Sequence, residues 1–416
     1  QFMHLARANE PFYMFYPHNV FKHYGEHLDD MDMTKMYKTL VADPRIKKRE
    51  GSARDILNQI ARMQLQSGYP YLMFRDNANK VHALKDIGDI KISNLCVEIQ
   101  QLQEVSEIGD IGETEGWDIK RDISCNLGSL NIANVMEAKD LYGAVFPAMK
   151  ALTAVSNMSH VKGAPGVAKA NEELHSVGLG VMNLHGYLAK NLIPYDSDEA
   201  KEFADVFFAA MNYYSIQASM HIARKTKTTF KDFEKSEYAK GDYFDKYTTH
   251  DHLPKSPIVK ELFEGMELPT KDDWAQLARR VQKHGLYHAY RLAIAPTQSI
   301  SYVQNATSSV MPIVDLIERR AYGDSETYYP MPFLDEMTAS VYQTAYQIDQ
   351  MKLIDLVSVI QEHVDQGIST ILYVNSTIST RELARLYAYA HHKGLKSLYY
   401  TRNKLLSVEE CTSCSI

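Results

Sequence analysis

A short stretch around Cys96 places three side chains with complementary chemistry close together in the sequence. Asn94, Cys96 and Glu98 alternate with apolar residues, and in an extended strand such alternate side chains point to one face. A thiol, a carboxylate and a carboxamide on one face can supply redox or radical chemistry, a proton acceptor and a hydrogen-bond donor. The same pattern fits a structural cysteine in a buried strand, because free cysteine is among the most buried residue types. The stretch alone therefore leaves both interpretations open.

Three further cysteines lie downstream, and two of them are paired near the C-terminal end. Cys411 and Cys414 form a Cys-x-x-Cys pair in a polar tail, which predicts disulfide exchange rather than packing. No metal site is expected there, because the pair supplies only two ligands and the sequence has no second pair. Cys125 precedes the apolar run 127–130, in which Gly128 predicts a close backbone approach or a bulge.

Two other segments carry polar or aromatic side chains in suggestive positions. A loop rich in hydroxyl groups follows a predicted strand, and its residues are Pro296, Thr297, Gln298, Ser299, Ile300 and Ser301. Hydroxyls and backbone amides at the end of a strand suit an anion, although an ordinary Ser/Thr turn has the same composition. Tyr399 and Tyr400 are adjacent in the last predicted strand, so their rings should point to opposite faces. Such a pair fits either ordinary packing or a relay between a surface and an interior site.

Composition limits the class of protein. The chain has 416 residues, of which 45% are hydrophobic, so it can build a sizeable core. Its net charge of −7 argues against nucleic acid or a membrane surface as the partner, and no apolar run could span a membrane. Four cysteines form no disulfide scaffold and predict a reducing, cytoplasmic location. The chain opens at Gln1 inside a helical pattern, so we expect it to be part of a longer protein.

Hydrophobic periodicity predicts helices and strands that alternate along the second half of the chain. Helical patterns cover residues 28–66, 143–159, 179–190, 197–225, 272–284, 351–366 and 380–393, and strand patterns cover 69–74, 291–295, 369–374 and 398–401. The segment 226–256 is charged and resembles a loop. Strands alternating with helices indicate a parallel sheet or barrel, so the predicted class is α/β.

Taken in order, the Cys96 stretch, the Cys125 run, the 296–301 loop, the tyrosine pair and the Cys-x-x-Cys tail resemble the catalytic large subunit of class I ribonucleoside-diphosphate reductase. The resemblance is strongest to class Ib. It covers the whole chain but only about the C-terminal half, or somewhat more, of the family's protein.

The resemblance implies a fold as well as a family. Residues 1–402 would form the C-terminal part of a ten-stranded α/β barrel, built from two parallel five-stranded halves and surrounded by many helices. A central finger hairpin at about residues 91–100 would carry the radical cysteine. Residues 403–416 would form a flexible, redox-active tail.

The resemblance also assigns chemical roles. Cys96 would be the thiyl radical that removes the 3′ hydrogen of the ribose. Glu98 would take the proton of the 3′ hydroxyl, and Asn94 would hydrogen-bond the sugar. Cys125 would be one of two thiols that supply reducing equivalents as the 2′ hydroxyl leaves as water. The loop 296–301 would bind the substrate diphosphate.

The same resemblance implies partners. Tyr400 would receive the radical from a small subunit that holds a dimetal centre, of manganese or iron, with a tyrosyl radical, and Tyr399 would pass it inward. Cys411 and Cys414 would reduce the active-site disulfide and be reduced by thioredoxin or a glutaredoxin-like protein. The large subunit would act as a homodimer, bind nucleotide effectors on its N-terminal part, and hold no cofactor or metal on this chain.

One element of the pattern is missing from this sequence. Cys125 needs a partner thiol, which in the family lies upstream, so we expect the chain to need an N-terminal portion for activity. Two alternatives stay open. A related enzyme using cobalamin or a glycyl radical would have no use for the pair Tyr399 and Tyr400. A fragment that only binds the small subunit would have no reason to retain the chemical residues.

Overall fold

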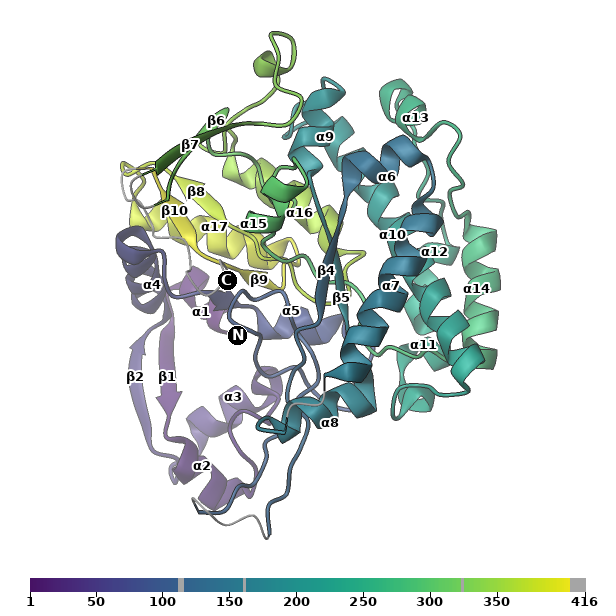
Figure 1. Ribbon diagram of the computed structural model, residues 1–416. Helices are drawn as coiled ribbons and strands as arrows, with labels where there is room; N and C mark the ends of the chain where they lie inside the picture. The colour runs from purple at the N-terminus through teal and green to yellow at the C-terminus, as the bar shows by residue number, and fades with distance from the viewer. Residues whose placement is uncertain (111–115, 160–161, 323–324, 405–416) are drawn as a thin grey trace. The chain divides into compact units, whose positions relative to one another are not determined.

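The structure is a computed structural model that describes residues 1–110, 116–159, 162–322 and 325–404 (Figure 1). The chain divides into two compact units. The first comprises Gln1–Pro70, Val374–Tyr389 and the described residues from Tyr400 onward, and the second comprises Tyr71–Tyr373 and Ala390–Tyr399. No helix among the described residues is both long and apolar enough to cross a membrane.

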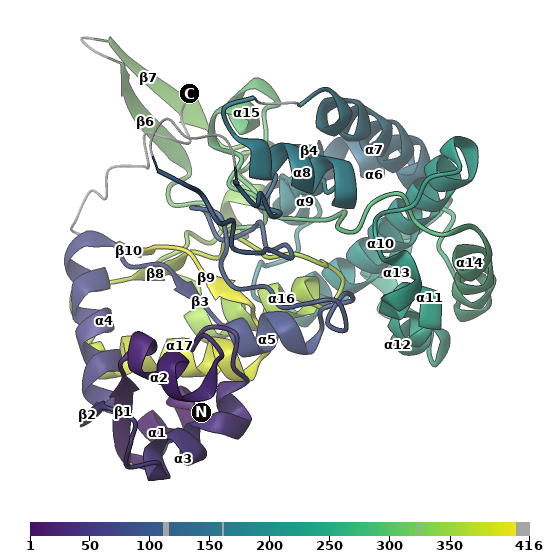
Figure 2. The same cartoon turned by 90° about the horizontal axis from the view of Figure 1, so that it is seen from below.

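The first unit packs helices around an antiparallel pair of strands (Figure 2). Its elements are α1 (Phe2–Ala8), β1 (Pro11–Phe15), α2 (Pro17–Tyr24), α3 (Met33–Ala42), β2 (Lys48–Ser52), α4 (Ala53–Ser67) and β10 (Thr401–Asn403). The helical pattern predicted over 28–66 is therefore interrupted. Asp43 ends α3 with an extended backbone, because the following Pro44 disfavours helical geometry at the residue before it. α4 restarts after Ser52, whose side chain accepts a hydrogen bond from the Asp55 amide.

A series of parallel segments forms the centre of the second unit (Figure 1). β4 (Leu127–Asn131) pairs in parallel with β5 (Gly178–Met182). Leu292 forms a parallel bridge with Leu179 of β5, and Ile294 of the same segment forms one with Ile368. The predicted strand at 291–295 thus contributes single bridges rather than a regular ladder. The alternation of strands and helices predicted from the sequence is confirmed in this unit.

Helices pack around these segments. α10 (Asp198–Thr226) begins at Ser197, whose side chain accepts from the Ala200 amide, with acidic residues in its first turn and basic residues in its last. The other helices with residues in this unit are α5 (Arg75–Lys80), α6 (Ile132–Ala138), α7 (Leu141–Met158), α8 (Pro165–Leu174), α9 (Leu184–Lys190), α11 (Glu237–Lys240), α12 (Asp245–Thr248), α13 (Pro257–Phe263), α14 (Lys271–His284), α15 (Gln298–Val303), α16 (Gln350–Gln361) and α17 (Thr380–His392). The remaining strands are β3 (Leu72–Met73), β6 (Ile317–Tyr322), β7 (Ser325–Pro330), β8 (Leu372–Val374) and β9 (Ser397–Leu398).

Three sequence predictions of local structure are wrong. Residues 179–190 begin as strand β5, because a short, fully buried apolar run does not distinguish a strand from a helix. Gly180 there allows a close approach, since an added Cβ would lie 2.4 Å from the Ala293 carbonyl oxygen. The loop 296–301 mostly forms α15, and the charged segment 226–256 contains the short helices α11 and α12.

The α/β class is confirmed, whereas a closed barrel is not observed in the part of the chain that the structure describes. The strands there pair in twos, and none of the sheets closes. The physical reason lies in the centre of the second unit, where neighbouring segments meet through isolated bridges that do not extend into ladders.

Candidate active site

The stretch around Cys96 is a tight turn rather than an extended strand, so the alternation that would place Asn94, Cys96 and Glu98 on one face does not apply. The Val97 amide donates to the Asn94 carbonyl at 3.2 Å, and the Ile99 amide donates to the Asn94 Oδ1 at 3.0 Å. Val97 has a φ of 64°, a left-handed conformation that a β-branched residue rarely adopts and that no sequence pattern announces. The turn buries Cys96 and Glu98 while it leaves Leu95 exposed.

The segment 367–369 holds this turn from the other side. The Gly367 amide donates to the Glu98 carbonyl at 2.8 Å, and a Cβ at Gly367 would lie 2.5 Å from the Val97 carbonyl oxygen. The Ser369 Oγ lies 2.7 Å from the Cys96 carbonyl oxygen and 3.1 Å from the Glu98 Oε2. A residue without a side chain and a small hydroxyl therefore fix the turn that carries the thiol.

Burial controls the charge of Glu98. Its side chain is 2% exposed, and loss of water raises the pKa of the carboxyl group above its ordinary value. Hydrogen bonds from the side chains of Asn94 and Ser369 oppose this shift by stabilising the carboxylate, but burial dominates. A raised pKa makes the carboxylate a stronger proton acceptor, as general base chemistry requires.

Tyr399 meets the thiol directly. The Tyr399 Oη lies 3.4 Å from the Cys96 Sγ, within hydrogen-bonding distance for sulfur, and its side chain is 1% exposed. Its amide donates to the Thr370 carbonyl at 2.8 Å, and its ring centroid lies 4.6 Å from that of Tyr71. A phenol that is hydrogen-bonded to a thiol in a buried site can exchange a hydrogen atom with it without any movement of the protein backbone.

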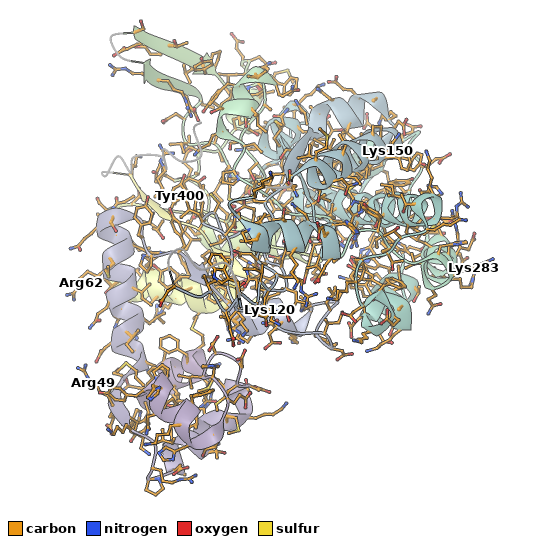
Figure 3. The ribbon with its side chains drawn as sticks, turned by 60° about the horizontal axis from the view of Figure 1, so that its bottom comes forward. Arg49, Arg62, Lys120, Lys150, Lys283 and Tyr400 are labelled. Atoms are coloured by element: carbon orange, nitrogen blue, oxygen red, sulfur yellow. The ribbon has the colours of Figure 1, made fainter. Side chains whose placement is uncertain are left out.

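Tyr400 follows Tyr399 in the chain but belongs to the first unit. The two tyrosines lie between β9 and β10 rather than within one strand, so the alternation of a regular strand does not apply to them. Figure 3 labels Tyr400 among the side chains. The side chain of Tyr400 is 9% exposed. The use of Tyr399 and Tyr400 as a relay between a surface and an interior site stays a prediction.

The segment that carries Cys125 is linked to the Cys96 region by hydrogen bonds at the preceding residue, Ser124. It is exposed and immediately precedes β4. Gln101, just after the turn, binds both backbone groups of Ser124: its Oε1 accepts from the amide and its Nε2 donates to the carbonyl, each at 3.0 Å. The structure thus joins Asn94, Cys96, Glu98 and Tyr399 in one buried cluster, and it ties the segment that carries Cys125 to the arm that carries Cys96.

The loop predicted to bind an anion lies at the end of a neighbouring parallel segment. Thr297 and Ser301 are buried, with their hydroxyl oxygens 2.7 Å apart, and the Thr297 Oγ1 also accepts from the Ser309 amide at 2.7 Å. Ser299 and Ile300 are exposed on the first turn of α15. Carboxyl ends of parallel segments share one edge, so this turn and Ser369 face the same side.

Some residues of this site escaped prediction, and others cannot be placed. Gly367, Ser369 and Gln101 contribute only through contacts that their local sequence does not indicate. The one available signal was a glycine just before the predicted strand 369–374 and a serine at its start. Cys411 and Cys414 lie outside the described residues.

Comparisons with known proteins agree on one family. A family model described as the barrel domain of ribonucleotide reductase matches residues 1–401. The ribonucleoside-diphosphate reductase subunit alpha of Bacillus subtilis (strain 168) is 50% identical over 416 residues, which is 100% of this chain and 59% of that protein. The subunit alpha of Mycoplasma pneumoniae is 38% identical over 99% of this chain and 59% of its own length. That of Treponema pallidum is 30% identical over 97% of this chain and 47% of its own length. The chain therefore spans less than two thirds of the relatives that it matches.

Proposed function

We propose that this chain, which belongs to the ribonucleotide reductase family, is the part of a large subunit that reduces ribonucleoside diphosphates to deoxyribonucleoside diphosphates in the cytoplasm. The observation that carries the proposal is the 3.4 Å separation of the Cys96 Sγ and the Tyr399 Oη beside the buried carboxyl group of Glu98. A radical donor, a radical acceptor and a base meet there in a site that excludes water.

In the proposed reaction, a Cys96 thiyl radical removes the 3′ hydrogen of the ribose and becomes a thiol. Glu98 accepts the proton of the 3′ hydroxyl, which drives the 2′ hydroxyl to leave as water after a thiol protonates it. Cys125 and a second thiol then supply a hydrogen atom to C2′ and one electron to the 3′ carbonyl, become a disulfide, and Glu98 returns its proton to the 3′ oxygen. Cys96 finally returns a hydrogen atom to C3′ and becomes the thiyl radical again. The sum is a ribonucleotide plus a dithiol giving a deoxyribonucleotide, water and a disulfide.

The radical would enter along Tyr400 and Tyr399. A small subunit carrying a dimetal centre of manganese or iron would generate it, and this chain would supply only the tyrosines and the thiol. Inside the site, each tyrosine loses its phenolic hydrogen and regains it when the radical returns. The hydrogen bond between Tyr399 and Cys96 supports the last transfer.

Several parts of this function lie outside the chain. The thiol partner of Cys125, the nucleotide effector site and the strands that would close the ten-stranded barrel are proposed to come from an N-terminal portion. The turn at Thr297 to Ser301 is proposed to bind the substrate diphosphate. Cys411 and Cys414 would transfer electrons from thioredoxin or a glutaredoxin-like protein, and the large subunit would work as a homodimer.

The test combines this chain with an N-terminal portion supplied from a relative such as the Bacillus subtilis protein, a small subunit and a dithiol. We expect Cys96→Ser to abolish deoxyribonucleotide formation, and Tyr399→Phe to abolish it while leaving thermal stability within about 1 kcal/mol of wild type. Tyr16→Phe, at an exposed tyrosine of the first unit, is the matched control for Tyr399→Phe.

Two results would contradict the proposal. Wild-type turnover by Cys96→Ser would remove the thiyl step. A complete mixture that binds the small subunit without reducing substrate would favour the alternative, a fragment that only binds that subunit.

A further inference from the structure

A second cluster of chemically active side chains lies away from Cys96, in the second unit. Asp205 of α10, His252 in the segment before α13, and His363 just after α16 bring one carboxylate and two imidazoles together. The ligand atoms of the three residues all lie within 4.8 Å of one another. Among the described residues this is the one group of histidine, cysteine and acidic side chains with such a geometry.

The distances within this cluster fit a shared metal ion. The His363 Nε2 lies 2.9 Å from the Asp205 Oδ1, and the His252 Nδ1 lies 3.0 Å from both carboxylate oxygens. A tetrahedral zinc ion with bonds of about 2.0–2.2 Å to nitrogen and oxygen holds neighbouring ligand atoms roughly 3.3–3.6 Å apart, so these atoms would separate by a few tenths of an ångström to admit the ion. Both imidazoles face the Asp205 carboxylate, and the buried His252 Nε2 has no hydrogen-bond partner among the described residues.

A second layer of residues orients these ligands. The Tyr247 hydroxyl lies 3.0 Å from the His363 Nδ1, the ring nitrogen that points away from Asp205. The Asn212 Nδ2 donates to the Tyr247 hydroxyl at 2.9 Å, and the Tyr247 ring stacks on Trp274 with centroids 3.9 Å apart. A hydrogen bond on the far nitrogen of a metal-bound histidine is the usual way to fix its orientation.

Access to the cluster is uneven. The side chain of His363 is 1% exposed and that of His252 is 8% exposed, whereas that of Asp205 is 34% exposed. The carboxylate therefore forms an open side through which an ion and a water ligand can enter.

We propose that Asp205, His252 and His363 form a binding site for a divalent transition metal of the zinc type, with water in the remaining position. Zinc accepts two imidazoles and one carboxylate as ligands. Magnesium and calcium favour oxygen ligands, so the two imidazoles favour zinc over either of them. The site stands apart from the thiol chemistry, and the inference does not depend on the proposed function.

Such an ion would connect two parts of the fold. Asp205 lies in the N-terminal third of the long helix α10, while His363 lies four residues before Gly367, which contacts the turn that carries Cys96. A metal ion that binds the folded protein and not the unfolded chain would stabilise the fold, by an amount set by its affinity and by the free metal concentration. The metal is therefore expected to raise the midpoint of thermal unfolding.

The test uses the 416-residue chain with Cys411→Ser and Cys414→Ser, so that the thiols of the tail cannot bind the probe. After treatment with a chelator, the protein is titrated with Zn²⁺ by calorimetry, and with Co²⁺ followed by visible absorption. We expect one ion per chain and a Co²⁺ spectrum of nitrogen and oxygen ligands without a thiolate charge-transfer band.

Two variants separate this site from adventitious binding. His252→Ala should weaken Zn²⁺ binding at least tenfold, and Tyr247→Phe about tenfold, because outer partners of metal ligands contribute that much. His250→Ala is the matched control, since this exposed ring lies beside that of His252, tilted at 48°, but is not a ligand. Absence of stoichiometric binding, or unchanged binding in His252→Ala, would overturn the proposal and leave a hydrogen-bonded triad. Circular dichroism checks folding, and the Co²⁺ spectrum of the parent chain decides the matter if His252→Ala does not fold.

Discussion

Ser369 lies between the two groups on which the proposed chemistry depends. Its hydroxyl has one proton and two acceptors, the Cys96 carbonyl at 2.7 Å and the Glu98 carboxylate at 3.1 Å. It touches neither the thiol nor, in the proposed reaction, the reacting atoms of the sugar. We therefore regard it as a positioning residue that sets both the location of the turn and the proton affinity of Glu98.

Replacing Ser369 with Ala should lower turnover roughly tenfold, the cost of about one hydrogen bond to a charged group. It should also move the acidic limb of the pH–rate profile to higher pH. The reason is that the hydroxyl lowers the pKa of Glu98, so its removal raises that pKa further. The measurement is kcat against pH, with Ser369→Thr as the variant that retains the hydroxyl. A uniform loss of activity with an unshifted profile would show a merely structural role.

Glu98 allows a prediction about stability. Its pKa is raised on folding, so between the ordinary and the raised value the folded protein binds more protons than the unfolded chain. Stability from this group is therefore present at low pH and is lost as pH rises through the raised pKa. Glu98→Gln should abolish turnover yet be at least as stable as wild type at pH 7. Thermal unfolding at several pH values checks this, and a strongly destabilised Glu98→Gln protein would contradict it.

The limits of sequence reasoning are clearest at this scale. Residue types made Asn94, Cys96 and Glu98 candidates but left a structural role open, and the family resemblance assigned their chemical roles. The turn itself was not predicted, because the left-handed backbone at Val97 depends on contacts made almost 270 residues later in the chain. Ser369 was missed for the same reason, since a serine beside a strand has no signature of its own.

Among the elements, the segment that begins at Gly367 controls how closely the Cys96 turn can pack. Parallel bridging at Ile368 and the amide of Gly367 hold this segment between its neighbour and the turn. Long periodic helices such as α10 were predicted almost to the residue, because their caps and charges are local. Short central strands were not, because burial on both faces removes the alternation that identifies a strand.

Gly367→Ala should destabilise the protein by about 1–3 kcal/mol, a typical cost of overpacking. The added Cβ would lie 2.5 Å from the Val97 carbonyl oxygen and 2.7 Å from the Gln100 Nε2, so the turn must shift. Thermal or denaturant unfolding measures the loss, and turnover should fall with it. Gly163→Ala is the matched control, because a Cβ there meets no atom within 4 Å. Equal stability of the two variants would show that the turn adapts without cost.

For the whole molecule, the open edges of its short sheets matter most. β4 has β5 as its one strand partner among the described residues, and the family relatives are considerably longer than this chain. Unpaired edges and half-covered apolar faces favour association with another chain. The need for an N-terminal portion, which the resemblance implies because Cys125 lacks a partner thiol, stays a prediction.

The chain on its own should therefore self-associate or unfold at a lower temperature than the same chain combined with an N-terminal portion from a relative. Light scattering after size-exclusion chromatography measures the first effect, and calorimetry measures the second. A monodisperse, equally stable chain in the absence of any companion would contradict this expectation.

The hydroxyl shared between a carbonyl and a carboxylate has a consequence for timing. While Glu98 is charged, the hydroxyl proton of Ser369 is drawn toward the carboxylate, and the hydrogen bond from Ser369 to the Cys96 carbonyl weakens. Once Glu98 has taken a proton, it can donate to the Ser369 oxygen, and the serine proton returns to the carbonyl. In the proposed reaction, the backbone of Cys96 is therefore held most firmly while a carbon radical is present, and a single proton restores the first arrangement at every turnover.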